Sequence, residues 1–103
     1  MVREIIWTQK AHLQKLEIFR YWNEQNASDS FSRSLDDAIN KAIDLLSKFP
    51  KLGIKTQVKN VRVKVVKNYL LIYRIDEEIL YILLFWDSRQ NPNDLNRLLN
   101  LYQ

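Results

Sequence analysis

The sequence predicts an α+β fold, in which a curved antiparallel sheet packs against an N-terminal helical hairpin. Three observations support this prediction. Hydrophobic residues recur at helical spacing through most of residues 9–49, interrupted by a polar stretch at 26–30. They alternate with polar residues, or run without interruption, in short segments of residues 58–86, which is typical of strands. A length of 103 residues with 47% hydrophobic residues indicates one domain, spanning residues 1–103.

The first half predicts a strand followed by two helices. A short apolar strand covers residues 3–7, and Thr8 then offers an N-cap oxygen to a helix that continues to residue 24. One face of this helix holds Ala11, Ile18 and Trp22, with Phe19 beside them. Because Leu13, Leu16 and Tyr21 lie off that face, we expect the helix to pack on more than one side.

The second predicted helix covers residues 31–49 and has a cleaner pattern. Its apolar face consists of Phe31, Leu35, Ala38, Ala42, Leu46 and Phe49. Pro50 and Gly53 end it, because proline cannot continue a helix and glycine favours the chain reversal that follows. The polar loop between the two helices is short, so they should form an antiparallel hairpin.

The second half predicts three strands and a short helix, which completes a βααβββα order. In residues 58–66 Val61, Val63 and Val65 point one way, while Arg62 and Lys64 form a basic outer face. Turns at 67–68 and 76–78 separate this strand from strands at 69–75 and 79–86. The last strand is apolar on both faces, so we expect it to be central and covered on both sides. Pro92 begins a final helix with an apolar face of Leu95, Leu98, Leu99 and Leu101.

The composition excludes several classes of site. The chain has no Cys and one His, so it offers no disulfide, no Cys-based zinc site and no thiol nucleophile, and we expect no metal and no cofactor. His12 stands alone on a helix and is given no catalytic role. The longest apolar run has eight residues, far short of a membrane span, and the N-terminal residues do not resemble a secretory signal. We therefore expect a cytoplasmic protein.

All of the basic excess lies in one segment. Residues 51–74 contain seven Lys and Arg residues and no acid, whereas the rest of the chain has nine basic and twelve acidic residues. This segment is interpreted either as a strand face kept soluble by lysines or as a patch for a polyanion or an acidic protein partner. The candidate binding residues are Lys55, Lys59, Arg62, Lys64, Arg74 and Arg89.

Five short motifs in this order resemble the RelE/ParE superfamily of type II toxin–antitoxin toxins, which includes plasmid stabilisation proteins. They are Ile-Trp-Thr at 6–8 with Ala11, Leu-x-x-Phe-Pro-x-x-Gly at 46–53, Val-Arg-Val at 61–63, Tyr-x-x-x-Tyr-Arg at 69–74, and Trp-Asp-Ser-Arg-Gln-Asn-Pro at 86–92. The resemblance covers about residues 3–95 and is closer to the ParE branch. It implies the toxin-like fold predicted above and neutralisation by a cognate antitoxin.

The resemblance leaves two mechanisms open. ParE-like members inhibit DNA gyrase, whereas RelE-like members are mRNA interferases, which cut messenger RNA on the ribosome. The implied partners are therefore an antitoxin, gyrase or a ribosome with its mRNA, and a second copy in a homodimer. A third alternative is an inactive protein with a toxin fold that only binds.

The residues favour the gyrase reading over RNA cleavage. RNA cleavage needs a base, an acid and cations around one phosphate. In this resemblance the RelE hairpin arginine falls on Leu70 and its late tyrosine near Leu95, while Arg89 is retained. The remaining candidates for a nuclease are Arg62, Arg89, Asp87 and Tyr102. The structural alternatives are a local Asp87–Arg89 ion pair and a pairing of Arg74 with an acid of the 76–78 turn.

Overall fold

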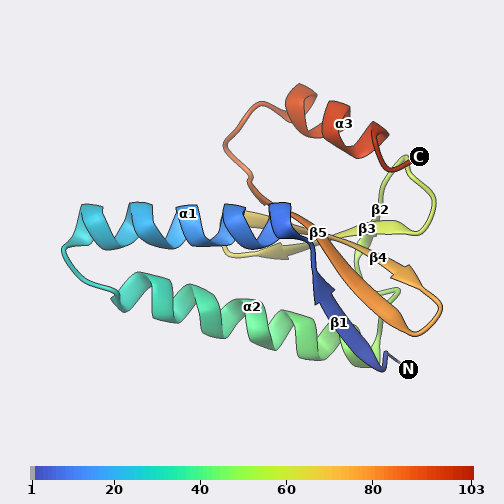
Figure 1. Cartoon of the computed structure of the whole chain (residues 1–103), viewed down its shortest axis with the longest axis horizontal. Coiled ribbons are helices and arrows are strands. Elements are labelled where there is room, and N and C mark those ends of the chain that lie inside the picture. The colour runs from blue at the N-terminus through green and yellow to red at the C-terminus, as the bar shows by residue number, and fades with distance from the viewer. Residues whose placement is uncertain (1) are drawn as a thin grey trace.

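A computed structural model describes residues 2–103. Its elements follow the predicted order with one additional short strand (Figure 1). They are β1 (Glu4–Trp7), α1 (Gln9–Asn26), α2 (Ser30–Lys48), β2 (Ile54–Lys55), β3 (Val61–Val66), β4 (Tyr69–Asp76), β5 (Ile79–Asp87) and α3 (Pro92–Asn100). No helix among these residues is long and apolar enough to cross a membrane.

The five strands form one sheet in the order β1-β5-β4-β3-β2. Strands β2 to β5 are antiparallel to their neighbours, as predicted, but β1 pairs with β5 in parallel. The parallel pairing is allowed because the connection between these two strands passes through the helices rather than through a tight turn. The α+β class, with a helical hairpin packed on the sheet, is confirmed.

A threonine side chain caps the start of the helical hairpin, and a serine side chain joins its two helices by hydrogen bonds. Thr8 Oγ1 accepts a hydrogen bond from the amide of Ala11 at 3.1 Å and donates to the carbonyl of Leu83 at 3.0 Å, which ties the start of α1 to β5. The Ser32 hydroxyl of α2 lies 2.6 Å from Asn23 Oδ1 and 3.1 Å from the carbonyl of Phe19, both on α1. The two helices are therefore joined by polar contacts as well as by their apolar faces.

The expectation that α1 packs on more than one side is wrong for the isolated chain. Its only fully buried residue is Ala11, whereas Leu13, Leu16 and Tyr21 remain 42–52% exposed. The sheet and α2 cover one side of α1, and no other described element reaches its far side (Figure 1). These three apolar side chains are therefore open to solvent, among exposed charged residues of the same helix.

The core lies on both faces of the sheet. One cluster joins the inner residues of α1 and α2 to Leu71, Tyr73, Ile82 and Phe85, and the other joins α3 to Ile72, Leu83, Leu84 and Trp86. The prediction that the last strand is central and covered on both sides is confirmed. Leu95 and Leu99 bury the inner face of α3, but Leu101 follows the helix and is 78% exposed, so its assignment to that face is wrong.

The basic face of β3 lies on the helix side of the sheet rather than on an open outer face. Arg62 and Lys64 alternate with the valines as predicted, but they share their side of the sheet with the buried Val66 and are themselves only half-exposed. Val65 shares its side of the sheet with Val61 and Val63 but is 52% exposed and lies outside both core clusters. The alternation of valines and cations was therefore predicted correctly. It did not indicate that α1 and α2 cover the face that carries the cations.

Candidate functional site

Four cations of the basic segment converge on one groove, called here the basic groove. It has a volume of about 410 Å³ and is lined by Lys51, Lys55, Lys59 and Arg62, together with Thr56 and Asn60. The sequence predicted Lys55, Lys59 and Arg62 as binding residues but omitted Lys51, although the charge count of residues 51–74 includes it. The groove brings together residues from the loop after α2, from β2 and from the start of β3.

The groove is shaped by the turn that connects β2 to β3. The Thr56 hydroxyl donates to the carbonyl of Val61 at 2.9 Å and accepts from the amide of Val58 at 3.1 Å. Asn60 closes the turn with a left-handed backbone, a conformation that asparagine tolerates better than most residues. This polar bracing fixes where Lys59 leaves the turn relative to Lys55 on β2.

The other wall is held by what we call the loop clamp, in which Tyr73 and Arg62 bind the Pro50–Gly53 loop. The Tyr73 hydroxyl accepts from the amide of Gly53 at 3.0 Å and donates to the carbonyl of Pro50 at 2.7 Å. The Arg62 guanidinium donates to the carbonyls of Lys51 and Gly53 at 3.1 and 2.9 Å. Burial raises the pKa of Tyr73, so the phenol stays neutral and can donate near neutral pH.

The loop clamp explains why residue 53 is a glycine. A Cβ atom at this position would lie 2.4 Å from the Tyr73 hydroxyl and 2.9 Å from the carbonyl oxygen of Val63. Its backbone angle φ is not in the left-handed region, so the requirement is for space and not for an unusual conformation. The Phe-Pro-x-x-Gly and Tyr-x-x-x-Tyr-Arg motifs thus meet in one structural contact.

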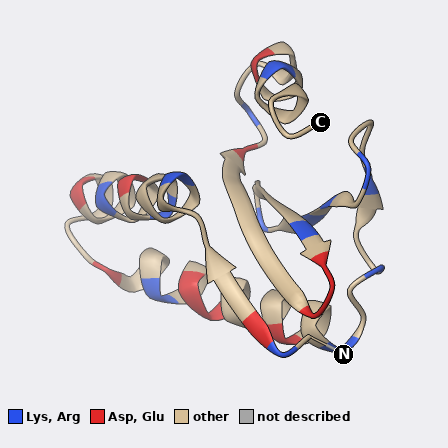
Figure 2. Ribbon diagram, turned by 45° about the vertical axis from the view of Figure 1, so that its right-hand side comes forward, with Lys and Arg blue, Asp and Glu red and all other residues tan. Residues whose placement is uncertain are grey.

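The cations of the basic groove are not neutralised within the chain. The ion pairs of residues 2–103 join Arg3 to Glu78, Arg33 to Asp29, Arg89 to Asp87 and Arg97 to Asp94, all outside the groove. No carboxylate lines the groove. Figure 2 shows the same separation, with much of the acidic colour on the helices and at the β4–β5 turn.

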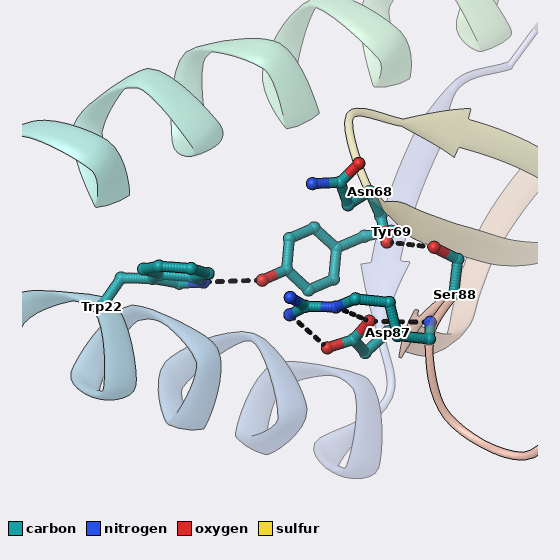
Figure 3. A network of polar contacts seen from close by, with 6 residues as sticks. Trp22, Asn68, Tyr69, Asp87 and Ser88 are labelled. Carbon is teal, nitrogen blue, oxygen red and sulfur yellow. Dashed lines mark hydrogen bonds and ion pairs between the residues drawn. The ribbon is translucent and has the colours of Figure 1, made fainter. Parts of the chain in front are cut away.

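A second groove, of about 570 Å³, lies between α1 and the end of β5 and contains Asp87 and Arg89 (Figure 3). The Arg89 side chain donates to both Asp87 carboxylate oxygens, at 2.9 and 3.1 Å, which confirms the predicted local ion pair. These hydrogen bonds hold the pKa of Asp87 below its ordinary value. Nearby, Trp22 Nε1 donates to the Tyr69 hydroxyl at 2.7 Å, which places Trp22 at the edge of the core.

Of the four candidate nuclease residues, Asp87 and Arg89 pair with one another, but Arg62 and Tyr102 lie elsewhere. Arg62 lies on the side of the sheet that α1 and α2 cover, whereas Arg74 lies on the side that α3 covers. The Arg74 guanidinium donates to the backbone carbonyl of Tyr102, so the predicted pairing of Arg74 with an acid of the 76–78 turn is wrong. Asp87 pairs in register with Tyr69, at the start of β4, and Arg74 lies near the other end of that strand. At the usual rise of a strand these positions are about 16 Å apart.

Lys64 lies further along β3 and does not line the basic groove. Within residues 2–103 no group of three or more His, Asp or Glu side chains is arranged to hold a metal ion.

Two of three comparisons with known proteins find a match, one to a family model and one to a solved structure. A family profile described as "ParE toxin of type II toxin-antitoxin system, parDE" matches residues 5–92. A solved structure described as a chromosomal ParDE toxin–antitoxin system from P. aeruginosa has a TM-score of 0.71 and covers 86% of this chain and 98% of its own, at 16% identity. A search of curated proteins finds no match.

Proposed function

Because the chain belongs to the ParE toxin family of type II toxin–antitoxin systems, we propose that it acts by binding DNA gyrase and inhibiting it. Membership makes the chain the toxin of a type II module with a cognate antitoxin as partner. The gyrase target is suggested by the family. We propose further that residues 1–103 act as a single domain in the cytoplasm, where gyrase works.

The observation that supports binding over RNA cleavage is the separation of the candidate nuclease residues. Attack by a 2′-hydroxyl needs a base, an acid and cations within hydrogen-bond reach of one phosphate. Here the Asp87 carboxylate forms an ion pair with Arg89, and Arg62 and Arg74 lie on opposite faces of the sheet. No described site therefore assembles the three groups that a ribonuclease requires.

The test compares two activities of the same purified protein. We expect inhibition of gyrase in a supercoiling assay and no mRNA cleavage with translating ribosomes. Cleavage that is lost in Arg62→Ala or Arg89→Ala would replace this proposal with a ribosome-dependent ribonuclease. Inactivity in both assays, with normal growth on expression, would identify an inactive toxin fold that only binds.

We propose that the antitoxin covers the exposed apolar surface of α1. Leu13 and Leu16, three residues apart on one face of α1, are 50% and 42% exposed, and exposed apolar side chains on a helix face fit a partner helix. Leu13→Ser with Leu16→Ser should weaken antitoxin binding measured by calorimetry. Leu101→Ser is the control, because Leu101 is also an exposed leucine, at 78%, but follows α3. Equal affinities for both variants would contradict this placement.

A homodimer built on the same α1 surface is the competing arrangement. Light scattering of the free toxin distinguishes the two, because a dimer would persist without antitoxin and dissociate in the Leu13→Ser, Leu16→Ser variant.

A further inference from the structure

The basic groove holds more positive charge than the fold itself uses. Arg62 has a structural task, since its guanidinium binds the two loop carbonyls, but no described intramolecular contact gives Lys51, Lys55 or Lys59 an anionic partner. The lysines are also exposed, so their ammonium groups reach solvent. These charges are therefore available to an external anion.

The pairing of β2 with β3 places two of these cations directly opposite one another. Lys55 and Arg62 are register partners, so their side chains leave the same face of the strand pair. Like charges at such positions disfavour the pairing. The two loop carbonyls offset part of the Arg62 charge, and an anion bound between the two side chains would offset the charge of both.

The lining of the groove favours a phosphate backbone over an acidic peptide. A peptide is usually held by apolar pockets that take alternate side chains. The valines at the floor of this groove, Val58 and Val61, are no more than 3% exposed and offer no such pocket. Pro50 and Ile75 also line the groove and are partly exposed, but the other accessible side chains are four cations, a hydroxyl and an amide. Cationic and polar groups of this kind contact phosphate and sugar without reading bases.

From these observations we propose that the basic groove binds the phosphodiester backbone of duplex DNA without sequence preference. The choice of duplex DNA rests on the proposed function, because gyrase acts on duplex DNA. The loop clamp supports the site by holding Arg62 and the loop that carries Lys51 in place before any ligand arrives. The groove would then let the toxin contact the DNA that its target holds.

The experiment measures fluorescence anisotropy of a short labelled DNA duplex over a range of salt concentrations. If the four cations each neutralise one phosphate, log K should fall with log salt at a slope of about −3.6. Lys55→Gln with Lys59→Gln should weaken binding and reduce the magnitude of that slope by about 2. The control, Lys10→Gln with Lys41→Gln, removes the same charge from exposed helix positions and should keep both values.

Several results would overturn the inference. They are no DNA binding by the wild type at low salt, an equal loss in the control variant, or a groove variant that binds DNA normally but loses antitoxin affinity. That last result would assign the groove to an acidic segment of the antitoxin. Circular dichroism of both variants establishes that they are folded. Gyrase inhibition by a wild type that binds no DNA would overturn this inference alone and leave the proposed function intact.

Discussion

The Tyr73 hydroxyl satisfies two backbone groups of a loop that would otherwise have no partner. It accepts from the Gly53 amide and donates to the Pro50 carbonyl, while the ring packs in the core. A buried backbone group without a partner is destabilising, so the Tyr73 hydroxyl, together with the Arg62 guanidinium, fixes the path of this loop. That path in turn positions Lys51 at the basic groove.

Removing that hydroxyl should destabilise the fold. Tyr73→Phe leaves the Gly53 amide and the Pro50 carbonyl unpaired, and we expect a loss of about 1–3 kcal/mol in the free energy of unfolding by urea denaturation. Tyr21→Phe is the control, because Tyr21 is 52% exposed and should be neutral.

Gly53→Ala should be destabilising as well, by about 1–3 kcal/mol from overpacking. Tyr73→Phe removes the hydroxyl oxygen that the new Cβ atom would approach most closely. The double variant should therefore lose less free energy of unfolding than the sum of the losses in the two single variants. Additive losses would show that the loop clamp does not act as one contact.

The Asp87–Arg89 ion pair makes a pH-dependent contribution of known sign. Because the folded-state pKa of Asp87 lies below its unfolded value, the stabilisation is present above about pH 4 and is lost as the pH falls through the folded-state pKa. Arg89→Gln should raise the pKa of Asp87 toward its ordinary value in an NMR titration. The stability difference between wild type and this variant should shrink at low pH. Arg97→Gln, at the ion pair on α3, should leave the Asp87 titration unchanged.

At the scale of elements, α1 and α3 show how much a helix depends on what it packs against. The two leucines Leu95 and Leu99 anchor α3 on the face of the sheet opposite the hairpin, and the Arg74 guanidinium holds the turn that follows it. The longer α1 buries one residue completely and leaves an apolar surface open. The short helix is thus a core element, and the long one leaves large apolar side chains exposed, where we propose that the antitoxin binds.

The contrast within α3 and its following turn is directly measurable. Leu99→Ala should lower the free energy of unfolding by about 2–5 kcal/mol, because Leu99 is 3% exposed and the substitution leaves a cavity. Leu101→Ala removes the same atoms from a residue that is 78% exposed and should be nearly neutral. Similar losses for the two variants in chemical denaturation would contradict the packing of α3 described above.

At the scale of the whole molecule, stability concentrates at the centre of the sheet. Strand β5 lies between β1 and β4 and has apolar side chains covered on both faces, so we expect its amides to exchange only when the whole fold opens. In contrast, β2 has two residues and lies at the edge of the sheet. The binding surfaces proposed above lie on this periphery and not in the central layer.

Hydrogen–deuterium exchange should reproduce this gradient. We expect the slowest exchange in β4 and β5. We also expect faster exchange in α1 than in α2, because α2 buries six side chains and α1 buries one, although the two helices have nearly the same length, 18 and 19 residues. Antitoxin should slow exchange in α1 most. Equal protection of the two helices in the free toxin would contradict the one-sided packing of α1.

The sequence by itself determined the order of the elements, the fold class and the family resemblance. Periodicity is a local property, so the change from helical spacing to alternation could be recognised along the chain, and Pro50 and Lys67-Asn68 marked where elements end. The seven cations of residues 51–74 were likewise visible as a count. Family resemblance then indicated a toxin, since its motifs occur in the expected order.

The tertiary structure alone decided which of these residues meet. The sequence placed Arg62 and Lys64 on one face of a strand, but it could not indicate that α1 and α2 cover that face. It proposed Arg62, Arg74 and Arg89 among the candidate binding residues. Strand register sets Arg62 and Arg74 on opposite faces of the sheet, and Arg89 follows β5 near the other end of β4. Contacts such as Tyr73 with Gly53 join residues that are distant in the chain, and no local pattern encodes them. Strand register and layer packing depend on contacts across the whole chain. The basic groove could therefore be recognised only in the tertiary structure.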